Sequence, residues 1–206
     1  MNRRLSLPLA LSMAASLLLG AATARGPVAD IGRDGAGVEV AGRSPAQDAW
    51  WENLRRLCGR AYAGVLAHGD PADDAFAGEA MTLRVERCAE ERIEIPFQVG
   101  DDRSRTWVVT RTERGLELKH DHRHADGSAD DVTWYGGHTD APGDEVAQLF
   151  PADEHSRRLF AEHGIPQSAA NVWSLEIVPG ERFSYVLRRP GRHFQVDFDL
   201  SDPVAP

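Results

Sequence analysis

The sequence predicts a mostly β protein: a single antiparallel meander barrel or sandwich of about eight to ten strands, with an N-terminal capping helix and one short inserted helix. Two observations support this fold class. From Met81 onward, apolar and polar residues alternate with a period of two, which is typical of strands with one buried face. Turn residues such as Pro179-Gly180 and Pro190-Gly191 separate the alternating segments at short intervals, as in sandwiches and barrels.

Residues 1–24 have the pattern of a signal peptide. A basic start, Arg3-Arg4, precedes an apolar run from Leu5 to Gly20, and Ala22-Thr23-Ala24 is a small-x-small cleavage site. The apolar run is too short for a convincing membrane-spanning helix. We therefore expect a periplasmic or secreted protein that is not inserted in the membrane after signal cleavage.

The mature chain fits a single domain. Residues 25–43 are rich in Gly, Ala and Asp and predict a flexible leader, whereas residues 44–202 predict the barrel and residues 203–206 a tail. Removal of the two signal arginines changes the formal net charge from −9 to −11. This acidic chain lacks the basic surface that nucleic acids and anionic membranes require, so we expect neither as a partner and expect a monomer.

Cys58 and Cys88 are the only cysteines of the chain. An even number of cysteines in an exported protein favours a disulfide. This bond would close a loop of about 30 residues and stabilise the fold by roughly 3–4 kcal/mol. The alternatives are two buried free thiols that pack as small apolar residues and, least favoured, a catalytic thiol.

The domain begins with a predicted helix. Ser44-Pro45-Ala46-Gln47 combines an N-cap, a proline at the first helical position and a capping-box partner. Trp50 and Leu54 follow at helical spacing, and Gly59 can end the helix. We expect this helix to pack on the sheet or to plug one end of it, with Trp50 and Trp51 in the core rather than exposed as a ligand platform.

A first strand and an acidic loop follow the helix. Alternation predicts the strand over residues 61–65, and residues 68–74 contain three aspartates and a proline. Because this loop lacks the ligand spacing and glycine of an EF-hand, we expect a solvated acidic loop rather than a calcium site. Further strands are predicted over 81–85, over 93–99 with Pro96 at an edge or bulge, and around Trp107 and Val109, with turns at 100–102 and 113–115.

The central feature of the sequence is a predicted β-hairpin at Asp126-Gly127, a residue pair that favours a type I′ turn. One face of this hairpin is apolar at its Leu116 end and rich in histidine at the other end. Such a face is expected for a wall that runs from a packed core to the mouth of a cavity. With Asp126 and Gly127 at the centre of the turn, the facing pairs are His124 and Ala129, His122 and Asp131, His120 and Thr133, and Leu118 and Tyr135.

The rest of the chain contains a loop, a helix and a β meander. Gly136-Gly137 is expected to release the hairpin into a loop that carries His138. A short helix is predicted near residues 153–163, stopped by Gly164 and Pro166. After it, Pro-Gly turns divide the clearest β pattern of the chain into three sequential strands.

The order of these elements resembles that of a known family. A helix that leads through Gly59-Arg60-Ala61-Tyr62-Ala63-Gly64 into an antiparallel meander is similar to the opening of the calycin, or lipocalin-like, barrels. Lipocalins usually have Gly-x-Trp at the first strand, where this chain has Tyr62, and their short helix precedes one terminal strand rather than three. The resemblance implies an interior cavity for a small ligand but assigns no binding residue.

The histidine-rich face is the candidate site. His120 and His122 alternate on one strand and can present two imidazoles to one zinc or copper ion, with His124, Asp131 or His138 as a third ligand. Asp131 could instead orient His122 by accepting its ring proton. Arginines of the turn at 101–106 could bind a ligand carboxylate or phosphate. The candidate ligand-binding residues are therefore His120, His122, Asp131, Thr133, Tyr135, Arg103 and Arg105.

Three functions are compatible with the sequence. The first is an exported lipocalin-like barrel that binds a small ligand or a divalent metal. The second is an envelope hydrolase in which His122, backed by Asp131, acts as a base, although no Gly-x-Ser-x-Gly or His-Glu-x-x-His motif supports it. The third is a protein-docking factor that uses a strand edge or the Trp50-Trp51 surface. In the plainest interpretation, the histidines are a solvated strand end and the arginines are surface charges balanced by neighbouring acids.

Overall fold

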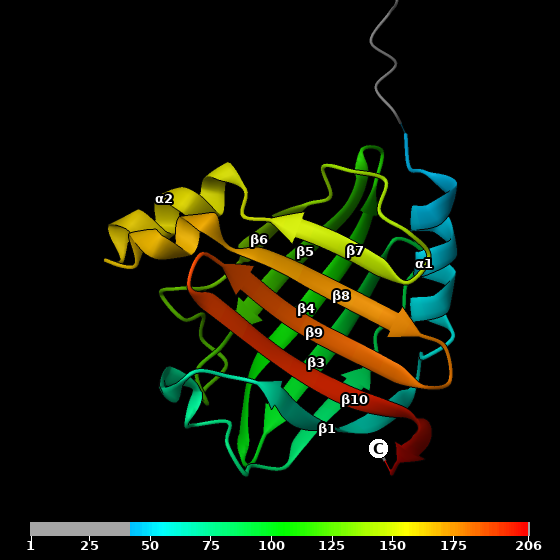
Figure 1. Ribbon diagram of the computed structural model, residues 1–206, viewed down its shortest axis with the longest axis horizontal. Helices are drawn as coiled ribbons and strands as arrows, with labels where there is room; N and C mark the ends of the chain where they lie inside the picture. The colour runs from blue at the N-terminus through cyan, green and yellow to red at the C-terminus, as the bar shows by residue number, and fades with distance from the viewer. Residues whose placement is uncertain (1–41, 206) are drawn as a thin grey trace, which may run out of the picture. The chain divides into compact units, whose positions relative to one another are not determined.

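The computed structural model describes residues 42–205. The predicted signal peptide, the predicted leader up to residue 41, and Pro206 lie outside the described residues. Ten strands form one antiparallel sheet that curls into a nearly closed barrel (Figure 1). The strands are β1 (Arg60–His68), β2 (Met81–Val85), β3 (Arg92–Val99), β4 (Asp102–Thr112), β5 (Gly115–His122), β6 (Tyr135–His138), β7 (Ala147–Pro151), β8 (Val172–Val178), β9 (Arg182–Arg189) and β10 (Arg192–Val204).

The strands form a simple meander. Their order in the sheet is β6-β5-β4-β3-β2-β1-β10-β9-β8-β7, so β1 joins the two halves by pairing with both β2 and β10. This single sheet confirms the predicted antiparallel meander barrel. The three sequential strands at the end of the chain are also confirmed as β8, β9 and β10, and β10 continues to Val204, two residues beyond the predicted boundary.

The alternating apolar residues face the interior of the barrel. In β3, for example, Ile93, Ile95 and Phe97 are buried, whereas the residues between them are partly exposed. The side chains that fill the interior come from nearly every strand and include Leu83, Trp107, Leu118, Trp173, Phe183 and Phe198. Because a strand places alternate residues on opposite faces, this pattern follows directly from the sequence.

Helix α1 (Pro45–Arg55) covers one end of the barrel and packs against β7 and β8. Its capping box forms as predicted, because the Gln47 backbone N–H donates to the Ser44 hydroxyl and the Ser44 N–H donates to the Gln47 side-chain oxygen. Trp50 and Trp51 are fully buried, and Trp50 Nε1 donates to the Leu175 carbonyl at 3.2 Å. The tryptophan pair is therefore core, as predicted, and is not available as a docking surface.

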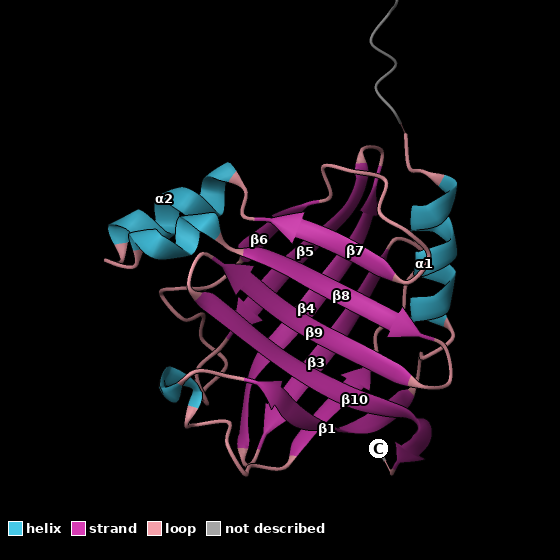
Figure 2. Ribbon diagram, in the orientation of Figure 1, coloured by secondary structure: helices cyan, strands magenta, loops and turns pink. Residues whose placement is uncertain are grey.

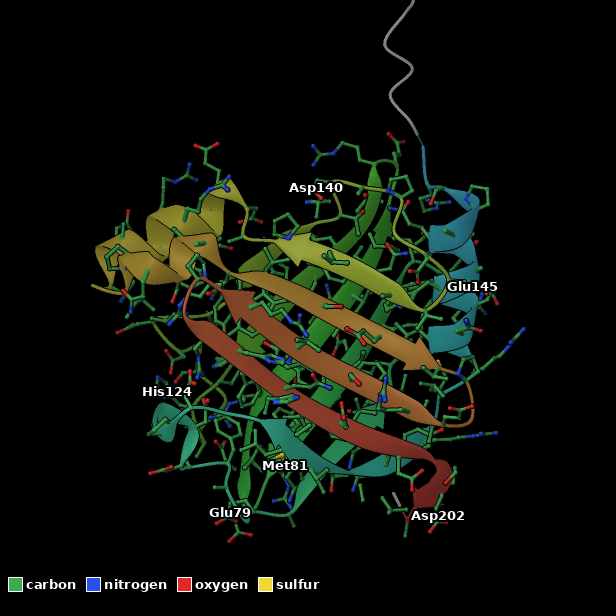
Figure 3. The ribbon with its side chains drawn as sticks, in the orientation of Figure 1. Glu79, Met81, His124, Asp140, Glu145 and Asp202 are labelled. Atoms are coloured by element: carbon green, nitrogen blue, oxygen red, sulfur yellow. A yellow bond between two sulfur atoms is a disulfide. The ribbon has the colours of Figure 1, made fainter. Side chains whose placement is uncertain are left out.

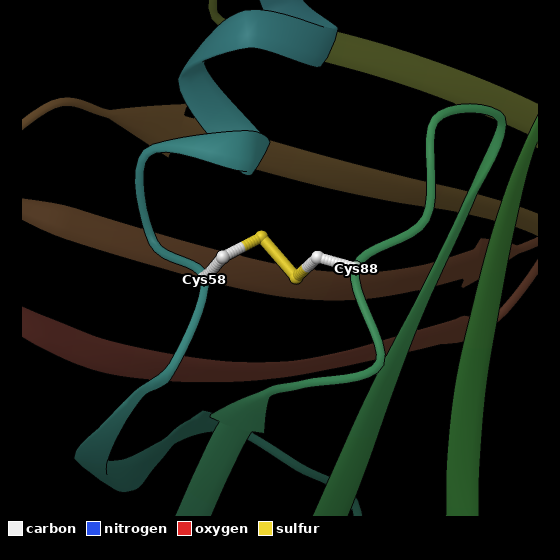
Figure 4. Close-up of a disulfide and its surroundings, with 2 residues drawn as sticks. All are labelled: Cys58 and Cys88. Atoms are coloured by element: carbon white, nitrogen blue, oxygen red, sulfur yellow. A yellow bond between two sulfur atoms is a disulfide. The ribbon is translucent and has the colours of Figure 1, made fainter.

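Cys58 and Cys88 form the predicted disulfide. The bond joins the segment after α1 to the segment after β2 (Figure 4). It therefore ties the capping helix to the sheet at the end of the barrel that α1 covers. Disulfides persist in oxidising compartments, so the bond indicates an environment of the extracellular type.

The seam of the barrel lies between β6 and β7, the two edge strands. We expected Gly136-Gly137 to form a loop, but both residues belong to β6, and β7 was not predicted at all. A Cβ atom on Gly137 would lie 1.8 Å from the Pro151 carbonyl oxygen, so this close approach requires glycine. The Asp153 N–H donates to the Gly136 carbonyl at 2.9 Å, and the Gly136 N–H donates to the Ser156 hydroxyl at 2.7 Å. These bonds connect β6 to the segment that follows β7 across the seam.

The remaining helices lie at the end of the barrel away from α1 (Figure 2). They are α2 (Glu154–Glu162) and two short 3-10 helices, η1 (Pro71–Asp73) and η2 (Pro166–Ala170). Helix α2 confirms the predicted inserted helix, and Asp153 caps its first turn by accepting from the Ser156 N–H. No helix within residues 42–205 is long and apolar enough to cross a membrane.

Candidate ligand-binding cavity

A cavity of about 140 Å³ lies inside the barrel at its open end, the end away from α1. A second cavity of about 470 Å³ adjoins it and shares the walls made by Tyr135, Tyr185, Leu187 and Arg192. Aromatic rings dominate the lining of the first cavity, and a few charged and polar groups join them. Its lining residues are Asp73, Phe76, Phe97, Arg105, Trp107, His120, His122, Tyr135, Tyr185, Leu187, Arg192 and Phe194.

One wall of the cavity is a row of stacked rings from β3, β4 and β9. The Trp107 and Tyr185 rings are 4.3 Å apart with an interplanar angle of 2°. The Phe97 ring also stacks on Trp107, at 4.8 Å, and the Phe76 ring lies nearly parallel to Phe97. Contacts of this kind hold rings in fixed positions, so the wall is preformed. Because the rings stack on one another and Trp107 and Phe97 are each only 2% exposed, the wall offers the cavity ring edges more than ring faces.

His120 is locked by two hydrogen bonds. Its side chain is buried, with Nδ1 3.1 Å from the Tyr135 carbonyl oxygen and Nε2 2.8 Å from the Tyr185 hydroxyl. Because a carbonyl only accepts, Nδ1 carries the proton and Nε2 accepts from Tyr185. Burial, with a smaller effect of His122, lowers the pKa of His120 to about 3. Both ring nitrogens are thus used within the protein.

His122 lies two residues farther along the same face, at the cavity. Its Nε2 is 3.1 Å from the Tyr135 hydroxyl, and its backbone N–H donates to Thr133 Oγ1 at 2.7 Å. Burial, followed by the positive charge of Arg105, lowers the pKa of His122, so the imidazole is neutral at pH 7. Thr133 does not line the cavity; it anchors the backbone beside it.

The hairpin register differs from the predicted one by one residue beside the turn, where Arg123 pairs with Ala129, and by two residues between β5 and β6. His120 pairs with Tyr135, and Leu118 pairs with Gly137. The turn contains the three residues 125–127 instead of two, with Gly127 at φ +85°. Residues 130–134 then form a loop before β6. A shift of two keeps Tyr135 on its predicted face, so His120, His122 and Tyr135 still converge.

The predicted partners His124 and Asp131 are not in the cavity. Both side chains are exposed on the loop between β5 and β6, and Figure 3 shows His124 at the outer margin of the open end. The predicted pairing of His122 with Asp131 is absent from the described residues, because the three-residue turn moves Asp131 out of register. The acid that would back a catalytic His122 is therefore missing at this position.

His138 lies on the outer face of the sheet. It pairs with Glu117 across β5 and β6, with Nε2 3.7 Å from Glu117 Oε1, whereas His120 and His122 face inward. Within residues 42–205, no three His, Cys, Asp or Glu side chains converge on a common point that could hold a metal ion. The four histidines that we predicted as zinc or copper ligands are therefore not assembled as a site.

A β-bulge separates the two candidate arginines. In β3 and β4, Phe97 pairs with Arg105, but Val99 pairs with Asp102 instead of Arg103. This one-residue shift turns Arg103 outward, where its Nε donates to the Gln98 side chain at 3.2 Å. Arg105 remains on the inner face and lines the cavity. The sequence prediction placed both arginines at the ligand, and only Arg105 is there.

The acidic loop contributes a part of the site that sequence reasoning missed. Asp73 is buried and accepts two hydrogen bonds from Arg192, at 2.5 and 2.6 Å, while Asp70 accepts a third at 2.8 Å. Burial raises the pKa of Asp73, but the hydrogen bonds and charge of Arg192 outweigh it and lower the pKa overall. This ion pair holds η1 over the cavity and places Phe76 against its wall. We expected a solvated acidic loop, and the burial and ion pairing of Asp73 show that this expectation was wrong for that residue.

No family model, curated protein or solved structure matches this chain. The geometry of the cavity is therefore the basis for assigning a function. Burial raises the pKa of both Tyr135 and Tyr185, which keeps their hydroxyls protonated at neutral pH. Those hydroxyls are used within the protein, in contacts with His120 and His122. The cavity combines aromatic walls with the N–H donors of Arg105, a combination typical of binding sites for small organic molecules.

Proposed function

We propose that this protein is an exported, lipocalin-like barrel that binds a small organic molecule in the cavity at its open end. The observation that supports this function is the contrast between the packed interior under α1 and the aromatic cavity at the other end. Ligand sites are typically concave, mostly apolar and supplied with a few converging polar groups. Arg105, His122 and Tyr135 are the groups that converge here.

Export is part of this proposal. The signal-peptide pattern of residues 1–24 supports it, and the disulfide between Cys58 and Cys88 is consistent with an oxidising compartment. The net negative charge argues against nucleic acid and anionic membranes as partners. We expect a periplasmic or secreted monomer whose partner is a small molecule.

Ligand binding fits the geometry better than the hydrolase or the metal-binding alternative. A hydrolase would need a base with an orienting acid, and the pairing of His122 with Asp131 does not occur in the described residues. A metal site would need several open ligands on one face, and both nitrogens of His120 are occupied. The aromatic wall made by Phe97, Trp107 and Tyr185 serves neither chemistry but suits the apolar part of an organic ligand.

A cavity-filling variant tests the proposal. Leu187 belongs to the wall between the two cavities, and Leu187→Trp should fill this space. The matched control is Leu149→Trp, because Leu149 is an exposed leucine on the outside of β7. A fragment screen by ligand-observed NMR should find small aromatic binders for the wild type and for Leu149→Trp, but not for Leu187→Trp. Binding that survives in Leu187→Trp, or no binder for any of the three, would contradict the proposal.

Native mass spectrometry with elemental analysis complements the screen. The protein is purified without a tag or chelator from the envelope of its own cells. We expect a protein mass without stoichiometric zinc or copper, and an organic adduct where the natural ligand is retained. A stoichiometric metal that disappears in the His120→Ala/His122→Ala double variant would favour the metal-binding alternative instead.

A further inference from the structure

Arg105 has unused hydrogen-bond donors at the cavity. Its Nη1 donates to the Asp102 carboxylate, and its guanidinium carbon lies 5.4 Å from the centre of the Phe76 ring. A guanidinium has five N–H donors in a planar fork, and the described residues supply an acceptor for one of them. The side chain is 27% exposed, so the remaining donors are accessible from the cavity. Such a fork matches the two oxygens of a carboxylate.

His122 supplies a second donor near Arg105. A phenol is a stronger acid than a neutral imidazole N–H, so the Tyr135 hydroxyl donates to His122 Nε2 and the ring proton lies on Nδ1. The described residues provide no acceptor for Nδ1. Arg105 and His122 lie directly opposite each other on β4 and β5, so both donors reach the same part of the cavity.

The other charges of the cavity are already paired. Arg192 is neutralised by Asp70 and Asp73, and Arg192 and the Asp70 backbone N–H occupy the Asp73 carboxylate. No acid of the described residues other than Asp73 lines this cavity. Arg105 is paired with Asp102 through one N–H only. A cationic ligand would therefore meet no unpaired carboxylate among the lining residues, whereas an anion would meet unused N–H donors of Arg105.

The space beside Arg105 and His122 has the size of a single ring. A volume of about 140 Å³ is similar to the roughly 150 Å³ of an engineered apolar cavity that binds benzene. The aromatic edges of Trp107 and Phe97 favour an aromatic ring in the ligand, because aromatic pairs also gain from edge-to-face contact.

We propose that the ligand is an aromatic carboxylate with a single ring, whose carboxylate accepts hydrogen bonds from Arg105 and His122 while its ring packs on the Trp107 wall. This inference rests on the proposed function and adds the chemical class of the ligand. It also separates Arg105 from Arg103, because a bulge places them on opposite faces of the same strand.

Isothermal titration calorimetry with three probes tests this inference. Benzoate carries the ring and the carboxylate, benzamide has nearly the same shape without the charge, and acetate has the carboxylate without the ring. We expect benzoate to bind at least about tenfold more tightly than benzamide, because hydrogen bonds to charged groups are the stronger ones. Acetate should show no measurable binding, since it cannot use the aromatic wall.

Variants of the two arginines locate the carboxylate. Arg105→Met should weaken benzoate binding about ten- to a hundredfold and change benzamide binding by less than about threefold. Arg105→Lys, which keeps the charge but loses the fork, should lie between Arg105→Met and the wild type. The matched control Arg103→Met should bind benzoate like the wild type, because Arg103 faces outward. Thermal unfolding of each variant establishes that it is folded.

The outcomes distinguish this inference from the proposed function. Equal binding of benzoate and benzamide, or full benzoate affinity in Arg105→Met, would overturn the carboxylate inference and leave the cavity as a binding site for a neutral molecule. If neither aromatic probe binds but the fragment screen finds ligands that Leu187→Trp excludes, the inference is also wrong while the proposed function stands. If the screen finds nothing either, both are wrong.

Discussion

The two ends of the barrel differ in how their interiors are filled. At the end under α1, Trp50 and Trp51 are fully buried, and the disulfide ties the helix to the sheet. At the open end, side chains of the same inner face leave a cavity that an ion pair between Asp73 and Arg192 keeps covered by η1. Stability is therefore expected to depend mainly on the closed end and binding mainly on the open end.

Strand β5 shows this gradient within a few residues. Leu116 and Leu118 are fully buried in the core, and His120 is buried but polar and fully hydrogen-bonded. His122, the last residue of the strand, is only partly buried and lines the cavity. One inner face thus changes from packing to binding over one strand, and His120 marks the boundary as a structural residue.

The largest expected effect is at the closed end. Trp50→Ala should lower the free energy of unfolding by about 3–5 kcal/mol, because it removes a fully buried indole and leaves a cavity. Urea unfolding followed by circular dichroism measures this loss. Benzoate affinity of the folded variant should remain within about threefold of the wild type. A parallel loss of affinity would show that the two ends are coupled.

Removal of the disulfide should have the next largest effect. The Cys58→Ser/Cys88→Ser double variant should lose about 3–4 kcal/mol of stability, because the bond closes a loop of 30 residues in the unfolded chain. Urea unfolding of the double variant and of the chemically reduced wild type should give the same value. A difference between the two would indicate that the serines, rather than the missing bond, cause the change.

The pH dependence of stability should report on His120. Its pKa is about 3 in the folded protein and near 6.5 when unfolded, so the unfolded state binds the proton first as the pH falls. Stability is unaffected above pH 6.5 and then decreases by up to about 1.4 kcal/mol per pH unit, or roughly 2 kcal/mol by pH 5. His120→Gln should make this decrease smaller, and the lowered pKa of His122 accounts for a remaining part in the same direction. His163→Gln, an exposed control at the end of α2, should not.

The loss of stability at still lower pH comes from Asp73 and can be separated from the effect of His120. The lowered pKa of Asp73 gives a contribution that is present above the unfolded value near 3.8 and is lost as the pH falls through the folded value. Asp73→Asn should therefore change the profile only below about pH 4.5, apart from a constant loss at higher pH. A single acid transition that neither variant alters would contradict both assignments.

The smallest effect on stability is expected at the cover of the cavity. Phe76 is only partly buried, so Phe76→Ala should cost roughly 1 kcal/mol. The same change removes a ring from the cavity lining and should weaken benzoate binding about tenfold. Calorimetry and urea unfolding on one sample compare the two effects directly. A stability loss as large as that of Trp50→Ala would erase the distinction between the two ends.

Local patterns were sufficient to predict the barrel. The period of two assigned inner and outer faces, the Ser44 capping box located α1, and the Pro-Gly turns separated β8, β9 and β10. The cysteine count predicted the disulfide, and the shared face of His120 and His122 located the cavity end. Each of these features depends on residues that are close in sequence or on a simple periodicity, so it can be read without knowing the fold.

Tertiary structure decided which polar groups meet in the cavity. A three-residue turn moved Asp131 away from His122, and one bulge turned Arg103 outward while Arg105 stayed inside. The close approach of Pro151 in β7 requires glycine at position 137, although Gly136-Gly137 was the signal for the predicted loop. Alternation assigns a face but not a register, and an inserted residue reverses the face beyond it.

The pairing of Asp73 with Arg192 is the clearest limit of sequence reasoning. The two residues are 119 positions apart, and each lies beside a turn where a charged residue is unremarkable. They meet because β1 and β10 are neighbours in the sheet, a consequence of barrel closure that no local pattern contains. The sequence therefore determines where the cavity lies. Long-range strand pairing decides which charges are neutralised within it, and it leaves Arg105 with N–H donors that have no acceptor among the described residues.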